Sequence, residues 1–177
     1  MSHSYKRSRI YKTLRNLDLR FEGLSNRKKA TQKTSEDMEL CAKAAVIELG
    51  GWIEVSVDEV LINYTTRKIA DPDELKRIRK DVIDKVYGFD YTRNFRPLME
   101  RILGIDLYNR MINPYAQDGR LQRLQAELST IKPHRNTAAH TNWTGATKNF
   151  EAPSVIINRL RTIYPILMSM FEFIDKS

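Results

Sequence analysis

The sequence predicts an all-α protein. Apolar residues recur at helical spacing along most of the 177 residues, and no segment shows the sustained alternation that is typical of strands. Only seven Gly and six Pro are present, and most fall between the periodic segments. We therefore expect one bundle of about six helices, in a chain long enough to enclose a single core.

The first expected helix is amphipathic and basic. Its apolar stripe consists of Ile10, Leu14, Leu17, Phe21 and Leu24. Residues 25–35 are polar and indicate a linker, and Ser35 is the expected N-cap of the next helix. This linker divides the chain into a basic N-terminal helix or arm, residues 1–33, and a helical domain, residues 34–177.

The second expected helix runs to about Tyr64 and is the longest in the chain. It is apolar on more than one side, so we expect it to be central and largely buried. Gly50 and Gly51 lie in its middle, where each glycine costs about 1 kcal/mol relative to alanine. They indicate either the close approach of another helix or a break.

Two shorter helices follow. Asp71-Pro72 begins a third helix that ends at Gly88, and a fourth ends at Gly104, followed by a short helical turn through Met111. The residues expected to face inward are Leu75, Ile78, Val82, Val86, Phe95, Leu98, Met99 and Ile102.

Prolines bound the last helices in this prediction. Asn113-Pro114 and Asp118-Gly119 indicate a loop, and a fifth helix over residues 121–131 is expected to stop at Pro133. Pro153 suits the first turn of a long closing helix through residue 174, with a kink expected at Pro165.

The net charge of +8 is concentrated at one end of the chain. Residues 1–33 carry ten Lys and Arg against Asp18 and Glu22, whereas residues 34–177 carry 20 basic and 20 acidic residues. The basic segment predicts either a surface for RNA or DNA phosphates or a solvated helix face that aids solubility. The candidate RNA contacts are Lys6, Arg7, Arg9 and Lys12.

Composition also bears on location. The single cysteine, Cys41, cannot form an internal disulfide or a cysteine-based zinc cluster. There is no apolar run of about 18 residues that would span a membrane, and the basic N-terminus lacks the apolar core of a signal peptide. We expect a cytoplasmic protein.

Residues 135–140, Arg-Asn-Thr-Ala-Ala-His, form the one stretch with evident chemistry. An arginine holds phosphate through a permanently charged fork, and histidine side chains exchange protons near neutral pH. On a continuous helix Arg135 and His140 would lie about 140° apart. Pro133 predicts that a helix begins here, capped by Asn136 or Thr137, so that the two side chains converge. The alternative is a capped helix with an ordinary Arg and a surface His.

No metal site is expected at these histidines. His134 and His140 are six residues apart, so on a helix they point in different directions. Neither has a second His or a carboxylate three or four residues further along. We expect no metal and no cofactor.

The motif and its context resemble the HEPN superfamily, and most closely the RiboL-PSP type of bacterial HEPN proteins. That superfamily combines an all-α domain with Arg, often a polar residue, and a His four to six residues after the Arg. Here Arg135-Asn136 and His140 fit the motif, a long closing helix follows, and an early long helix carries Glu48 and Glu54. The resemblance covers about residues 36–175.

The resemblance implies a HEPN-like helical bundle that acts as a metal-independent endoribonuclease. It implies a homodimer whose two motifs line one cleft, with Arg135 and His140 as the catalytic pair and Asn136 as a polar assistant. Glu54, or less readily Glu48, would orient the arginine. One variant of the superfamily transfers nucleotides onto a Tyr two residues after the His, but this chain has Asn142 there.

The expected reaction is RNA cleavage by the substrate's own 2′-hydroxyl, which leaves a 2′,3′-cyclic phosphate. Two histidines from two subunits would supply the base and the acid. Such nucleases are often toxins or anti-phage effectors, so an antitoxin or other regulatory protein is an expected partner. The alternatives are a non-catalytic HEPN module that binds RNA, nucleotide or a regulator, and a helical toxin- or antitoxin-like module that works through protein contacts alone.

Overall fold

The computed structural model describes residues 5–27, 29, 31–140 and 150–177, and over these residues the chain is helical with no strand. The all-α fold predicted from the sequence is therefore confirmed. The described α-helices are α1 (Arg9–Ser25), α2 (Gln32–Lys68), α3 (Pro72–Ile78), α4 (Arg96–Leu103), α5 (Ile105–Gln117), α6 (Arg120–His140) and α7 (Pro153–Asp175). A 3₁₀ turn, η1 (Tyr5–Arg7), precedes α1.

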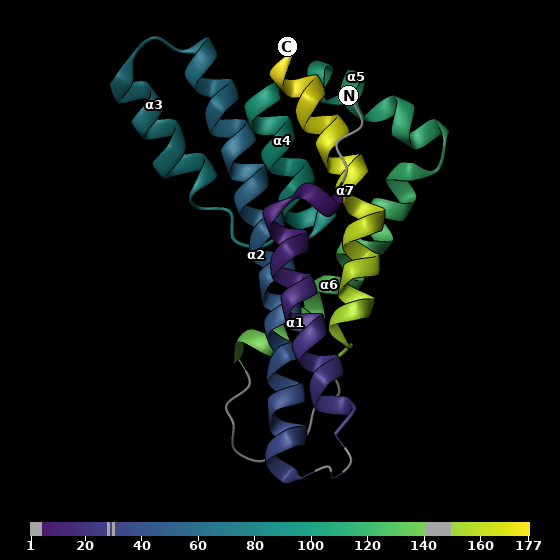
Figure 1. Cartoon of the computed structure of the whole chain (residues 1–177). Coiled ribbons are helices and arrows are strands. Elements are labelled where there is room, and N and C mark those ends of the chain that lie inside the picture. Colours follow the sequence, from purple (N-terminus) through teal and green to yellow (C-terminus); the bar gives the residue numbers. More distant parts are fainter. Residues whose placement is uncertain (1–4, 28, 30, 141–149) are drawn as a thin grey trace.

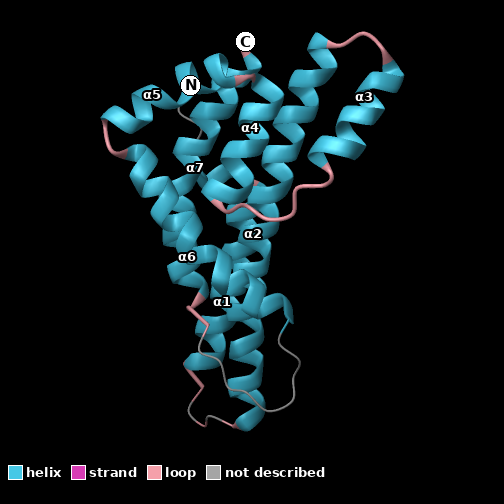
Figure 2. Ribbon diagram, turned by 180° about the vertical axis from the view of Figure 1, so that it is seen from behind, coloured by secondary structure: helices cyan, strands magenta, loops and turns pink. Residues whose placement is uncertain are grey.

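Helix α2 is the axis of the bundle. It runs the length of the molecule, and α1, α6 and α7 all pack against it (Figure 1). Helix α1 lies in front of α2 and α7, whereas α6 crosses behind α2, as the reverse view in Figure 2 shows. Helices α1 and α6 therefore occupy opposite sides of α2.

The core forms where these helices meet. Leu14 of α1, Leu49 and Ile53 of α2, Leu128 of α6 and Leu167 of α7 are all fully buried. Four of the five residues in the apolar stripe predicted for the first helix face inward: Ile10, Leu14 and Leu24 are buried, and Leu17 packs against the core, whereas Phe21 is only partly buried. Burying side chains of this size contributes about 1.5–3 kcal/mol each, so α1 is an integral part of the bundle.

The start of α2 differs from the prediction. The N-cap is Thr31, whose hydroxyl accepts a hydrogen bond from the backbone N–H of Thr34 at 3.1 Å, so the helix begins before Ser35. It then continues to Lys68 instead of ending near Tyr64. Gly50 and Gly51 do not break it.

A π-helical segment changes the register after α3. The residues Arg79–Ile83 form η2, with one extra residue in the turn relative to an α-helix. As a result Ile83 is the fully buried residue, whereas the predicted inward residue Val82 is only partly buried. A second π segment, η3 (Tyr91–Phe95), leads into α4, which ends at Gly104 as predicted.

Two prolines lie inside helices where the sequence predicted interruptions. Pro114 lies within α5, so the predicted short turn through Met111 is a full helix. Pro133 lies within α6, which continues to His140. A proline removes one backbone hydrogen bond, and the packing of α6 against α2 and α7 holds the helix across that gap. Pro153 occupies the first turn of α7, as predicted.

Candidate functional site

Arg135 of α6 is held by a carboxylate of α2. Its Nη2 donates a hydrogen bond to Glu54 Oε2 at 3.0 Å, and the side chains of Arg135 and Glu54 are 30% and 23% exposed. The ion pair is therefore half-buried, and part of the guanidinium still faces solvent. A guanidinium that is held by a carboxylate on one side and exposed to solvent on the other is suited to binding an oxyanion.

Gly50 makes this contact possible. A Cβ atom at Gly50 would lie 2.8 Å from Cγ of Arg135 and 3.2 Å from the ring of Phe89. Gly51 has no heavy atom within 4 Å of the same position. Of the two explanations for the glycine pair, close approach of another helix is therefore correct, and it applies to Gly50 alone.

We expect Gly50→Ala to destabilise the fold and Gly51→Ala to stabilise it. The methyl group at Gly50 would press on Arg135, and overpacking of this kind costs about 1–3 kcal/mol. At Gly51 the substitution meets open space and gains about 0.5–1 kcal/mol from helix propensity. Urea unfolding of the two variants measures the difference, and equal effects of the two substitutions would contradict the close contact.

The other predicted assistants differ in their positions. Asn136 is exposed, and its Oδ1 accepts a long hydrogen bond of 3.4 Å from Nη1 of Arg135. Glu48 is also exposed and lies about 120° around α2 from Glu54. Among the described residues the structure therefore brings Glu54 to Arg135, and it leaves Glu48 on another side of the helix.

His140 does not converge with Arg135 within one chain. It is the last residue of α6 and is exposed, while the unbroken helix separates the two positions by about 140°. The predicted helix start after Pro133, capped by Asn136 or Thr137, is wrong because α6 runs through this segment. A second molecule has to supply the histidine if the two groups act on one phosphate.

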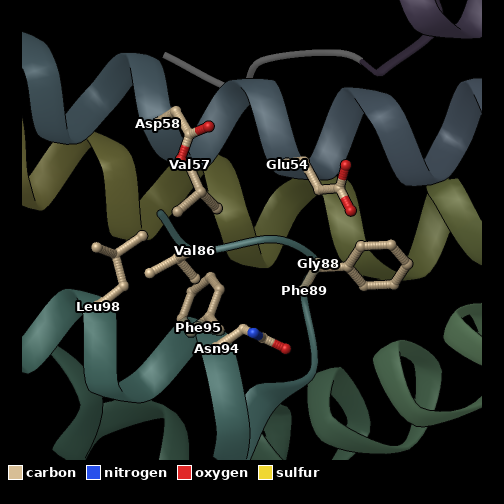
Figure 3. Close-up of a pocket in the computed structure, with 9 residues that line it drawn as sticks. All are labelled: Glu54, Val57, Asp58, Val86, Gly88, Phe89, Asn94, Phe95 and Leu98. Atoms are coloured by element: carbon tan, nitrogen blue, oxygen red, sulfur yellow. The ribbon is translucent and has the colours of Figure 1, made fainter. Parts of the chain in front are cut away.

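A small pocket lies beside Glu54. Figure 3 shows Glu54 projecting from α2 toward Gly88 and Phe89, with Asp58 one turn further along. Burial, helped by the negative charges of Asp84 and Glu54, raises the pKa of Asp58 to about 6. Glu54 Oε1 is buried and has no hydrogen-bond partner among the described residues.

This pocket cannot hold a nucleotide. Its volume of about 10 Å³ corresponds to a single water molecule. The solvent-facing side of the Arg135 guanidinium lies outside this pocket. Glu54, which lines the pocket, holds the Arg135 guanidinium toward α2 through its Oε2 atom.

One ion-pair cluster, centred on Arg159, was not predicted from the sequence. Arg159 of α7 donates to Glu127 of α6 at 2.6 Å and to Glu151 at 2.5 Å. Arg159, and then the nearby charge of His134, lower the pKa of the Glu151 carboxyl, and the acids in turn raise the pKa of Arg159. The cluster joins α6 to the chain just before α7. The signal in the sequence was an Arg inside an apolar helix.

Asn142, which stands two residues after His140, lies outside the described residues. No group of three or more His, Cys, Asp or Glu residues in the described part of the chain is placed to hold a metal ion. None of the described helices combines the length and apolar character needed to cross a bilayer.

The fold and the site together define an all-α bundle with an inter-helix Arg135–Glu54 pair and, on another side of α6, an exposed histidine. Comparison of the chain with protein-family models, with curated proteins and with solved structures gives no match.

Proposed function

We propose that this protein is a metal-independent endoribonuclease of the HEPN type, with a site assembled from two copies of the chain. The observation that carries the proposal is the Arg135–Glu54 pair, because it fixes a guanidinium at the surface of the bundle with donors left for a phosphate. His140 lies on the same helix, about 1.4 turns further on, and is exposed.

The chemistry needs few groups because RNA carries its own nucleophile. One imidazole removes the 2′-hydroxyl proton, and the 2′-oxygen attacks the adjacent phosphorus. The bond to the 5′-oxygen breaks, and a second, protonated imidazole gives that oxygen its proton. Arg135 donates to the non-bridging oxygens while their charge grows. The products are a 2′,3′-cyclic phosphate and a 5′-hydroxyl.

A second copy would complete this arrangement. One chain offers Arg135 toward α2 and His140 on another side of α6, whereas two chains related by a twofold axis offer two of each. Helix α2 presents three exposed apolar side chains, Leu40, Ile47 and Val55, within about 80° of one another around the helix. Glu54 borders this face, so a partner seated there would lie next to Arg135.

We expect Ile47→Glu to convert a dimer to a monomer and to reduce RNA cleavage with it. A charge in the centre of an apolar contact is left without a partner and weakens association. Ile105→Glu is the matched control, because Ile105 is exposed on α5 away from this face. Sedimentation velocity and a cleavage assay are read together. A monomeric wild type that cleaves RNA would contradict the shared site.

The direct test of activity uses the purified full chain, a fluorescent RNA and EDTA. Cleavage in the presence of the chelator supports the proposal. As a HEPN-type toxin or anti-phage effector, the enzyme would be restrained in the cell by an antitoxin or another regulatory protein. A search for a protein that abolishes cleavage when it is added in equimolar amount tests this second part.

The alternative is a non-catalytic module that holds RNA or nucleotide. One observation favours it, namely the separation of His140 from Arg135 within a single chain. This module would bind the same RNA at the same arginine and leave it intact. Binding without cleavage by the wild-type dimer would therefore replace the nuclease with the binding module.

A further inference from the structure

Helix α1 and its flanks carry a set of basic side chains without acidic partners. The exposed ones among the described residues are Lys6, Arg7, Arg9, Lys12, Arg20, Arg27, Lys29 and Lys33. The two acidic residues of segment 1–33, Asp18 and Glu22, both contact Arg15. None of the exposed basic residues forms an ion pair with a described residue.

Three of these residues lie along one side of α1, and a fourth follows the end of the helix. Arg9, Lys12 and Arg20 lie within about 80° of one another on α1, with Asn16 between them, and Arg27 comes after the C-cap residue Asn26. We call these four basic residues the track. Arg9 and Arg20 are separated by about 16 Å along the helix axis. Gly23 faces the same side and has open space where a side chain would stand. The track is therefore long, accessible and of one sign.

The track fits a phosphate backbone better than a membrane or a protein. A helix that binds at a lipid interface inserts its apolar face, but the apolar face of α1 is buried against α2 and α7. A protein interface usually has an apolar or aromatic centre, and this side of α1 exposes a single large apolar residue, Leu19. Basic and amide side chains in a row are typical of contacts to phosphates.

We infer that the exposed side of α1 is a second RNA-binding surface that holds the backbone of single-stranded RNA away from the Arg135 site. Helix α1 packs on the side of α2 opposite to α6, the helix that carries Arg135, so the track and Arg135 belong to helices on different sides of α2 in one chain (Figure 1; Figure 2). The track therefore engages long RNA and cannot contact the phosphate that is being cleaved at Arg135 of the same chain. This inference rests on the proposed function, which identifies the bound polyanion as RNA.

The test compares two sets of four charge-neutral substitutions in a His140→Ala background that prevents cleavage. The first set is Arg9→Gln, Lys12→Gln, Arg20→Gln and Arg27→Gln. The control set is Lys80→Gln, Arg101→Gln, Arg110→Gln and Arg123→Gln, which are exposed and have no ion-pair partner among the described residues. Both sets remove three arginines and one lysine. Fluorescence anisotropy measures binding of a labelled single-stranded 20-mer between 50 and 200 mM salt.

Four phosphate contacts give a slope of about −2.8 in a plot of log affinity against log salt, which is about a 50-fold loss over this range. We expect the first set to reduce the slope by about that amount, and the control set to leave it unchanged. Equal losses from the two sets would overturn the inference, because they indicate diffuse attraction. Binding of α1 to anionic vesicles in preference to RNA, lost in the first set, would also overturn it.

The two proposals fail in different ways. With His140 restored, the first set should raise KM for long RNA and leave the cleavage rate of a tetranucleotide unchanged within about twofold, since the short substrate does not reach α1. If RNA binds through α1 but is never cut, the proposed nuclease activity is wrong and the RNA-binding surface on α1 stands. If the first set leaves the KM for cleavage of long RNA unchanged, the RNA-binding surface on α1 is wrong and the nuclease activity stands.

Discussion

His140→Ala is expected to lower the rate of RNA cleavage by about 10²- to 10⁴-fold, the contribution of a positioned general acid or base. His140 is exposed at the end of α6, so its loss should leave the melting temperature within about 1 °C of wild type, as for most surface substitutions. Cleavage of a fluorescent RNA under single-turnover conditions is the measurement. A large kinetic loss with an unchanged fold would separate chemistry from stability.

His134→Ala is the control for this variant. His134 lies on the same helix, six residues earlier. It interacts electrostatically with Glu151, which is not part of the Arg135–Glu54 contact. We expect less than a threefold change in rate. Comparable losses from the two histidine variants, or full cleavage by His140→Ala, would contradict the assignment of His140.

Arg135→Ala is expected to lower the cleavage rate by about 10²- to 10³-fold, as removal of a donor to a developing oxyanion does. It should also cost about 1–3 kcal/mol of stability, because Glu54 would keep a half-buried charge without its hydrogen bond. Arg135→Lys keeps the charge but loses the fork, so we expect stability to recover more than the rate does. Urea unfolding and single-turnover cleavage are measured on both variants.

The matched control is Arg67→Ala. Arg67 also joins α2 to another helix, through Asp175 at 3.2 Å, but it lies about 20 Å along α2 from Glu54. We expect no more than a twofold change in cleavage. If the Arg67 and Arg135 variants lost activity to the same degree, the loss would reflect the packing of α2 in general.

The fold was predictable because most of the core follows a helical period. The stripe of α1 and the apolar surface of α2 identify their buried sides without any tertiary information. The predicted breaks failed where packing outweighs local preference, as at Pro114 and Pro133, which both lie inside helices. The π segment η2 also shifted the buried position from Val82 to Ile83, and no residue pattern indicates such an insertion.

The candidate site was predictable only in part. The sequence supplied Arg135 and two possible acids, and the distance of 3.0 Å selects Glu54 over Glu48. The role of Gly50 required coordinates, since a glycine pair alone does not show which member meets a neighbour. The sequence predicted that Arg135 and His140 converge because a helix was expected to begin at Pro133. Since α6 is continuous through Pro133, the two side chains can meet only if they come from two chains.

We propose that RNA is cut by its own 2′-hydroxyl at a phosphate that Arg135 holds and on which His140 acts. The most direct measurement is cleavage, in EDTA, of an RNA with one defined cleavage site and of the same RNA carrying a single 2′-deoxy nucleotide immediately 5′ of the scissile phosphate. We expect the all-ribose strand to yield a 2′,3′-cyclic phosphate end and the deoxy strand to remain intact at that site. Equal cleavage of both strands, or a requirement for added metal, would contradict this mechanism.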